Sequence, residues 1–142
     1  RTVLAKREAF RQAFDGFVPD RVAAFTSDDV DHLVSTPGII HNRRKIDAAI
    51  SNARATVAMR NDSAVADGPS HLGELVWSYR QTLDPLPRSK EEVPTQLPES
   101  VALAADLKSR GFCFVGPTTM LALMAAIGIV NTDIVGTHRR PR

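Results

Sequence analysis

Apolar residues recur along most of the chain at spacings of three and four, which is the period of an α-helix. The clearest stripe lies in residues 42–59 and consists of Ile46, Ala49, Ile50, Ala53 and Val57. Further helices are predicted at 2–14, 20–25, 27–35, 70–79, 98–110 and 117–127. Alternating strand patterns are no longer than four residues. The sequence therefore predicts an all-α fold, a compact bundle of about six to seven helices.

Local signals set the ends of these helices. Thr26 followed by Asp29 resembles a capping box, which begins a helix, and Pro37 disfavours helical geometry at Thr36. Gly16, Gly111 and Gly128 follow predicted helices, where glycine suits the left-handed position. Residues 60–70 and the proline-rich segment 82–97 are predicted to be irregular. Residues 117–127 are apolar almost all round, so this helix is predicted to be central in the core.

Composition narrows the class of protein. The 142 residues suit one domain, predicted to span 1–142. The apolar runs fall well short of the roughly 18 residues that cross a membrane, and the N-terminus lacks the pattern of a signal peptide. We therefore expect a cytoplasmic protein with no membrane partner. Cys113 is the single cysteine, so a disulfide framework is excluded, and we expect an inert buried thiol there.

The positive charge of the chain is local. The whole chain carries a net charge of +2, whereas residues 41–60 hold five basic side chains and one acidic side chain, a net +4. Three of these cations, Arg43, Arg44 and Lys45, open the predicted helix at 42–59. A cluster of acidic residues, Asp28, Asp29 and Asp31, begins the preceding helix. The helix dipole favours acids there, and we do not expect a catalytic pair.

The connection between those two helices contains Gly38, Ile39 and Ile40. Connections are usually polar, so this turn is predicted to be packed. A packed turn that presents cations and the unpaired amides of residues 40–42 suits a phosphate of nucleic acid. The candidate DNA-binding residues are Gly38, Ile39, Ile40, His41, Asn42, Arg43, Arg44 and Lys45. The alternative is an ordinary helix corner with a solvated basic turn.

Other candidate residues have simpler interpretations. Trp77 and Tyr79 could stack on a base, but their helical spacing favours core aromatics. The four histidines have no spacing typical of metal ligands, so surface or capping roles are expected. Motifs such as a glycine-rich phosphate loop or a serine nucleophile elbow are not found.

Six blocks of the chain, in their order and spacing, carry a family resemblance. They are 4–10 (LAKREAF), 33–46 (LVSTPGIIHNRRKI), 52–55 (NARA), 76–79 (VWSY), 107–112 (LKSRGF) and 114–119 (FVGPTT). Together they closely resemble DNA-3-methyladenine glycosylase I, a bacterial helix-hairpin-helix repair family, over essentially the whole chain. The helix-hairpin-helix would lie at about 27–59.

The resemblance implies an enzyme of base-excision repair that acts on double-stranded alkylated DNA, most simply as a monomer. Such an enzyme hydrolyses the N-glycosidic bond of 3-methyladenine after the hairpin grips the backbone and the base is extruded into a pocket. The methylated base is cationic and a good leaving group, so the family uses a pocket glutamate and stacked aromatics. The resemblance places Trp77, Thr118 and Ala122 at the base pocket, with Ala122 where the family often has a polar residue.

Two departures from the family pattern shape the expectations for this chain. The pocket glutamate, the stacking residues and two zinc ligands of the family precede the position of Arg1, so the chain resembles an N-terminally truncated member. No catalytic residue is assigned, and apolar surface is expected at Val3, Leu4 and residues 120–127. Asp133 and Thr137 stand at the other two zinc positions. Threonine is a poor zinc ligand, so no metal or other cofactor is expected.

These departures leave three hypotheses open. The first is a 3-methyladenine glycosylase. The second is a catalytically inactive helix-hairpin-helix DNA-binding remnant of that family. The third is a helical protein-interaction domain that has kept only the fold.

Overall fold

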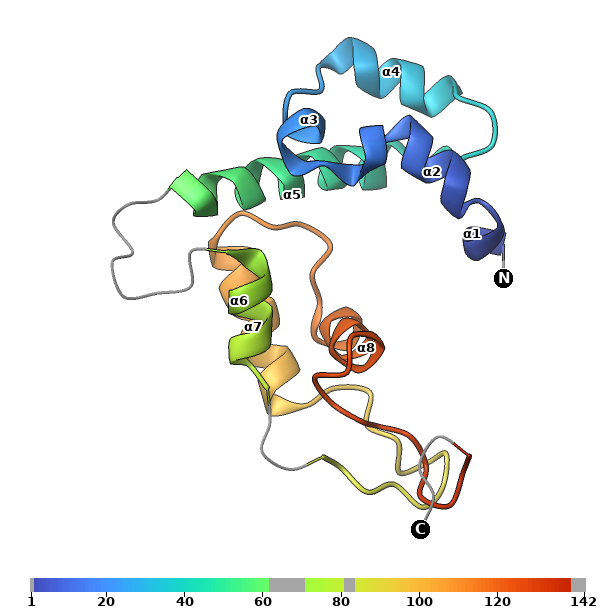
Figure 1. Ribbon diagram of the computed structural model, residues 1–142, viewed down its shortest axis with the longest axis vertical. Helices are drawn as coiled ribbons and strands as arrows, with labels where there is room; N and C mark the ends of the chain where they lie inside the picture. The colour runs from blue at the N-terminus through green and yellow to red at the C-terminus, as the bar shows by residue number, and fades with distance from the viewer. Residues whose placement is uncertain (1, 62–70, 81–83, 139–142) are drawn as a thin grey trace. The chain divides into compact units, whose positions relative to one another are not determined.

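The computed structural model describes residues 2–61, 71–80 and 84–138 (Figure 1). These residues form eight α-helices and one 3-10 turn, and no β-strand is found among them. The all-α prediction is confirmed. None of the described helices is long and apolar enough to cross a membrane.

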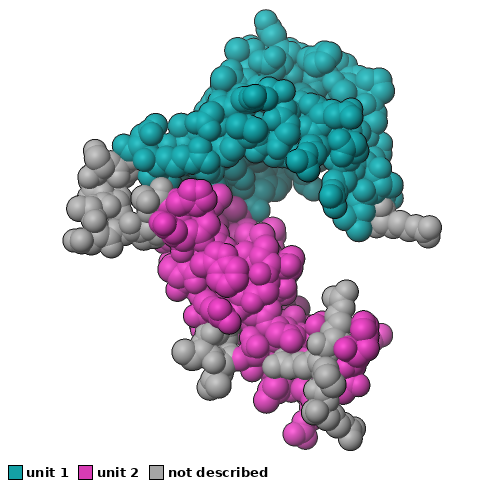
Figure 2. Space-filling model, viewed as in Figure 1, with its two compact units in different colours: residues 1–68, 110–114 teal, residues 69–109, 115–142 magenta. Residues whose placement is uncertain are grey.

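The chain divides into two compact units (Figure 2). The first unit comprises residues 1–68 and 110–114, and the second comprises residues 69–109 and 115–142. The single domain expected for 1–142 stays a prediction.

The first unit is built around one long helix, α5, which packs against α3 and α4. Its elements are α1 (Thr2–Ala5), α2 (Arg7–Ala13), the 3-10 turn η1 (Asp15–Phe17), α3 (Pro19–Ala23), α4 (Ser27–Ser35) and α5 (Arg43–Asn61). The buried core consists of Phe14, Val22, Val30, Leu33, Ile39, Ile46, Ile50 and Ala53. Since Ile46, Ile50 and Ala53 belong to the stripe predicted for residues 42–59, that stripe is the core face of α5.

The first predicted helix, 2–14, is divided in the structure. The backbone of Lys6 leaves helical geometry (φ −97°, ψ 5°) between α1 and α2. After α2, three successive residues have positive φ: Asp15 (52°), Gly16 (70°) and Phe17 (58°). Gly16 is therefore the middle of a left-handed turn and does not simply end the helix. The Phe17 ring stacks on Phe14 with centroids 5.2 Å apart, a contact that helical periodicity does not reveal.

The capping box that begins α4 is confirmed. Thr26 Oγ1 accepts a hydrogen bond from the Asp29 amide (3.4 Å), and Asp29 Oδ2 accepts one from the Thr26 amide (2.7 Å). The Thr26 hydroxyl also donates to Asp29 Oδ2 (2.9 Å). The two bonds that Oδ2 accepts, the one from the Thr26 amide first, lower the pKa of the Asp29 carboxyl from its ordinary value. Helix α4 ends at Ser35, as the proline at position 37 predicts.

The second unit contains α6 (Leu72–Ser78), α7 (Pro98–Ser109) and α8 (Pro117–Ala126), and α7 packs against α8. Its buried side chains include Leu75, Val76, Leu103, Ala104, Leu107, Met120, Leu121 and Met124. The His71 ring caps α6 by accepting a hydrogen bond from the Gly73 amide (3.0 Å). The capping role expected of a histidine is therefore confirmed at His71. Ser70, the first residue of the helix predicted at 70–79, lies outside the described residues.

Three predicted burials are wrong. Helix α8 is not buried all round, because Leu123 and the following Ile127 are 37% and 41% exposed, while Met120, Leu121 and Met124 are buried. The apolar surface expected within residues 120–127 is therefore found at Leu123 and Ile127. Trp77 is 46% exposed, so it is not a core aromatic. Cys113 is also exposed. Periodicity identifies an apolar face but not the element that covers it. The exposure expected for Val3 and Leu4 is confirmed.

Candidate functional site

The hairpin, residues 36–42, joins α4 to α5 and packs against the core of the first unit (Figure 1). Ile39 is only 4% exposed and lies in that core, whereas Ile40 is 41% exposed. The prediction of a packed turn is therefore correct for Ile39. Gly38 has a φ of +92°, and a Cβ atom added there would lie 3.3 Å from Cβ of Ala9. Glycine is thus required at position 38 both by its backbone conformation and by the approach of α2.

Several hydrogen bonds fix the backbone of the hairpin. Lys6 Nζ donates to the carbonyl oxygen of Gly38 (2.8 Å), and His41 Nε2 donates to that of Thr36 (2.8 Å). The Asn42 amide donates to the carbonyl oxygen of Ile40 (2.9 Å), so the expectation of an unpaired amide is wrong at Asn42. These bonds help to stabilise the observed conformation of the turn.

Asn42 also caps α5. Its Oδ1 accepts a hydrogen bond from the Lys45 amide (3.1 Å). The amides of Arg43 and Arg44 belong to the same first turn, where an α-helix offers no internal acceptor. An anion at this end of α5 would therefore meet these two amides and the positive end of the helix dipole.

The basic residues of this region divide into two groups. Arg54 donates to the carbonyl oxygens of Ala23 (3.0 Å) and Phe25 (2.8 Å) beside the end of α3, and Arg60 pairs with Asp20 (2.9 Å). These two arginines serve the fold. Of the five basic residues in 41–60, Arg43, Arg44 and Lys45 are therefore the ones that lie beside the hairpin, at the start of α5.

The three hairpin cations differ in their partners. Arg43 Nη1 lies 2.6 Å from Asp31 Oδ1, across α4 and α5, and this bond raises the pKa of the guanidinium further. In the described part of the chain, neither Arg44 nor Lys45 pairs with an acidic side chain. The predicted positive patch is thus real but smaller than the charge count indicates.

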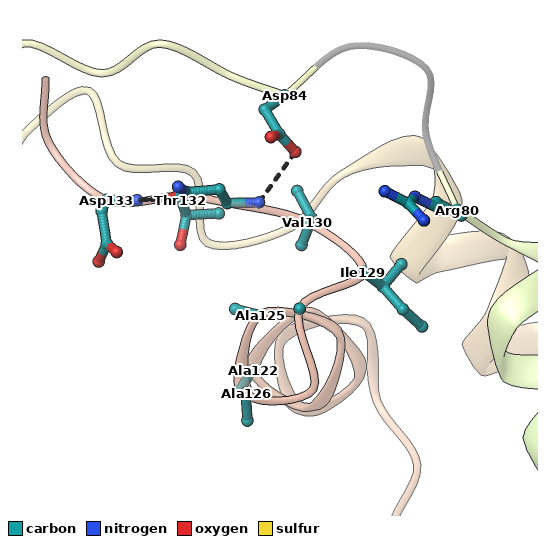
Figure 3. A pocket seen from close by; sticks show the side chains of 11 residues that line it. Arg80, Asp84, Ala122, Ala125, Ala126, Ile129, Val130, Thr132 and Asp133 are labelled. Atoms are coloured by element: carbon teal, nitrogen blue, oxygen red, sulfur yellow. Dashed lines mark hydrogen bonds between the residues drawn. The ribbon is translucent and has the colours of Figure 1, made fainter. Parts of the chain in front are cut away.

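A cavity of about 580 Å³ lies in the second unit (Figure 3). It is lined by Arg80, Asp84, Ala122, Ala125, Ala126, Gly128, Ile129, Val130, Asn131, Thr132 and Asp133. Figure 3 shows the alanines on α8, Thr132 and Asp133 farther along the segment that follows this helix, and Arg80 near Ile129. Small side chains on the helix leave room for a flat ligand between groups of both charges.

The predicted base-pocket residues are only partly brought together. Ala122 lines the cavity, and Thr118 does not. Trp77 lies next to a lining residue, because the guanidinium of Arg80 is 5.9 Å from the centre of its ring. Sequence reasoning missed Arg80 and Asp84, since neither belongs to a periodic pattern or a motif.

Hydrogen bonds order one wall of the cavity. The Asn131 amide donates to Asp84 Oδ1 (2.9 Å), and the Asp133 amide donates to Asn131 Oδ1 (2.9 Å) (Figure 3). The Val135 amide donates to the carbonyl oxygen of Pro87 (2.9 Å). These bonds tie the segment after α8 to the irregular segment that begins at Asp84.

One of the two residues at the zinc positions, Thr137, does not fit a zinc ion. The Thr137 hydroxyl donates to the carbonyl oxygen of Ile134 (2.8 Å), and a hydroxyl is a poor zinc ligand. Among the residues that the structure describes, no group of three or more His, Cys, Asp or Glu side chains could hold a metal. We therefore assign no metal-dependent role to Asp133 or Thr137.

Curated proteins similar to this chain are DNA-3-methyladenine glycosylases. The protein of Escherichia coli (strain K12), DNA-3-methyladenine glycosylase 1, is 41% identical over 137 residues, which are 95% of this chain and 70% of that protein. The DNA-3-methyladenine glycosylase of Haemophilus influenzae is 35% identical over 136 residues, covering 94% of this chain and 70% of that protein.

Solved structures agree with this likeness. A crystal structure of 3-methyladenine DNA glycosylase I matches 99% of this chain and 75% of its own with a TM-score of 0.88 and 42% identity. The Staphylococcus aureus enzyme, whose structure concerns 3-methyladenine recognition, matches 99% of this chain and 73% of its own with a TM-score of 0.85 and 28% identity. The family model for methyladenine glycosylases matches residues 1–140. The chain belongs to the methyladenine glycosylase family, the family of DNA-3-methyladenine glycosylase I.

Proposed function

We propose that this protein repairs alkylated DNA by excising 3-methyladenine through hydrolysis of the N-glycosidic bond. Membership of the methyladenine glycosylase family supports this reaction. The observation that carries the proposal within this chain is the hairpin, which combines a buried anchor, Ile39, with three exposed cations at the start of α5.

The hairpin would hold one DNA strand by its phosphates. The amides of Arg43 and Arg44 and the dipole of α5 attract an anion, while Arg44 and Lys45 add charge without acidic partners among the described residues. Contacts of this kind position the protein on double-stranded DNA but read no sequence. The residues proposed to bind DNA are Gly38, Ile39, Ile40, His41, Asn42, Arg43, Arg44 and Lys45.

The cavity of the second unit would take the extruded base. A purine ring could lie over the alanines of α8, and the two carboxylates of Asp84 and Asp133 outnumber the single cation Arg80, so the lining favours a base that carries positive charge. The chemical demand on the protein is modest, because an N3-methylated adenine in DNA is cationic and leaves readily. We assign the chain roles in holding DNA and recognising the base, and we assign no side chain of the chain to bond cleavage.

Fluorescence of Trp77 tests this pocket directly. Trp77 is the single tryptophan of the chain and stands beside Arg80 at the cavity. Titration with 3-methyladenine should change its emission and saturate, with a weaker response to adenine. Ala122→Leu, which fills the floor of the cavity, should abolish the response, whereas Ala102→Leu on the exposed face of α7 should not. A saturable response that Ala122→Leu leaves intact would move the base pocket elsewhere.

A second candidate function is DNA binding without catalysis. The observation in its favour is that the hairpin is complete, whereas no catalytic side chain is assigned within the chain. Release of 3-methyladenine from methylated duplex DNA, measured by chromatography, separates the two functions. Release above background supports the glycosylase, and tight DNA binding without release supports the second candidate.

A further inference from the structure

An acidic side chain lies directly against Arg43, one of the three cations beside the hairpin. Asp31 is on α4, and its Oδ1 is 2.6 Å from Nη1 of Arg43, the first residue of α5. Both side chains remain open to solvent, 62% exposed for Asp31 and 53% for Arg43. A surface that binds a polyanion gains nothing from an exposed carboxylate, so the position of Asp31 calls for an explanation.

We propose that Asp31 competes with the DNA phosphate for Arg43 and thereby limits how tightly the hairpin holds DNA. This inference rests on the proposed function of the hairpin. In the free protein the carboxylate occupies the guanidinium, and on binding a phosphate oxygen replaces it. Arginine recognises both anions through the same charge-assisted hydrogen bonds, so the exchange needs no rearrangement of the backbone.

Because the Arg43–Asp31 ion pair is exposed to solvent, replacing the carboxylate by a phosphate oxygen costs little free energy. Ion pairs in contact with water contribute little to stability, since solvent screens both charges. Asp31 nevertheless keeps its negative charge next to the bound phosphate and weakens the complex. Weak binding to undamaged DNA suits an enzyme that must leave one site and search the next, because sequence-independent contacts otherwise hold it in place.

The alternative role for the pair is a brace between α4 and α5. Other contacts already hold these two helices together, because Val30 and Leu33 of α4 pack in the same core as Ile46 of α5. Ile39, which lies in that core as well, anchors the turn between them. A brace and a competitor also predict opposite effects. Loss of a brace would weaken DNA binding, and loss of a competitor would strengthen it.

The test compares Asp31→Asn with a matched variant, Asp28→Asn. Asp28 is an exposed acid on the same helix and forms no ion pair among the described residues. Binding to a fluorescein-labelled duplex is followed by anisotropy at several salt concentrations, after thermal melts establish that each variant is folded. At low salt we expect Asp31→Asn to bind about twofold to fivefold more tightly. Its dependence of log Kd on log salt should steepen by up to about one. Asp28→Asn should change the affinity by less than about twofold.

Arg43→Gln completes the cycle. In the Arg43→Gln background, Asp31→Asn should raise DNA affinity no more than Asp28→Asn does, because the arginine for which Asp31 and the phosphate compete is absent. Equal gains for Asp31→Asn and Asp28→Asn, an undiminished gain without Arg43, or weaker binding by Asp31→Asn would overturn the competitor role.

Lys45→Glu, together with Arg43→Gln, distinguishes failure of the role of Asp31 from failure of the proposed DNA binding by the hairpin. If Lys45→Glu and Arg43→Gln both leave DNA affinity unchanged, the hairpin is not the DNA site, and the role of Asp31 fails with it. If they weaken binding while Asp31→Asn fails to strengthen it, the hairpin stands and only the role of Asp31 is lost.

Discussion

Replacement of Gly38 by alanine should damage both the fold and DNA binding. Gly38 combines a φ of +92° with a close neighbour, because an added Cβ would lie 3.3 Å from Cβ of Ala9 on α2. Gly16 offers a matched control. Its φ is +70°, and a Cβ added there would meet nothing within 4 Å. Both substitutions force alanine into left-handed backbone, but only one of them also forces α2 and the hairpin apart.

The expected losses of stability follow from the left-handed backbone and from the contact with Ala9. Left-handed geometry costs an alanine about 1–2 kcal/mol, and the stiffer unfolded chain returns about 0.4–1 kcal/mol. Gly16→Ala should therefore lose at most about 1.5 kcal/mol of the free energy of unfolding. Gly38→Ala should lose up to about 1 kcal/mol more, the low end of the cost of overpacking, because α2 and the hairpin would have to move apart by a few tenths of an ångström.

Urea denaturation followed by circular dichroism gives the two stabilities, and anisotropy with labelled duplex DNA gives the affinities. Only Gly38→Ala should weaken DNA binding, because it displaces the amides at the start of α5. Ala9→Gly should recover part of the loss in the Gly38→Ala protein, since it removes the opposing atom. Equal destabilisation by Gly38→Ala and Gly16→Ala, with no rescue, would refute the steric reasoning.

Three further expectations concern stability and metal binding. Asn52 Nδ2 donates to the carbonyl oxygen of Cys113 (3.1 Å), and Asn52 Oδ1 accepts from the Cys113 amide (2.7 Å). Asn52→Ala should therefore lower the free energy of unfolding by about 1–2 kcal/mol. Asn61→Ala, at an exposed position of the same helix, should lower it by much less. The pKa of Asp29 lies below its ordinary value of 3.8, so the stabilisation by this carboxylate is complete above that pH and is lost as the pH falls through the folded pKa. The difference in thermal stability between the native protein and Asp29→Asn should accordingly narrow in acid, and a constant difference would count against the capping box. The purified protein should contain no tightly bound zinc by atomic emission, and one equivalent would reverse the interpretation of Asp133 and Thr137.

Features encoded by neighbouring residues could be predicted from the sequence. The capping box needs only Thr26 and Asp29, three positions apart, and the end of α4 follows from Pro37. The turn at Gly38 and the burial of Ile39 follow from an apolar pair beside a glycine in a connection that would otherwise be polar. In each case the cause and the effect lie within one turn of the backbone.

Features that depend on distant partners could not be predicted in this way. Lys6 interrupts the first helix and reaches a carbonyl oxygen 32 positions away. The pairing of Arg43 with Asp31 could not be predicted from the sequence either, since both residues have the pattern of ordinary surface charges near helix starts. Trp77 lies in a predicted amphipathic helix and Leu123 in a helix that is apolar almost all round, yet both side chains are exposed. Periodicity identifies the apolar face of a helix but not which element, if any, packs against that face.

Charge reversal at the hairpin tests the role of this motif most directly. The variant Arg43→Glu with Lys45→Glu is compared with Lys90→Glu and Lys108→Glu, which make the same change in net charge at exposed positions of the second unit. Affinity for labelled duplex DNA is measured against salt concentration with two unrelated sequences. The hairpin variant should bind both duplexes at least about tenfold more weakly, with a salt slope lower by about two, because two phosphate contacts are lost. Equal affinities for the two double variants would contradict the assignment of the hairpin as the DNA-binding site.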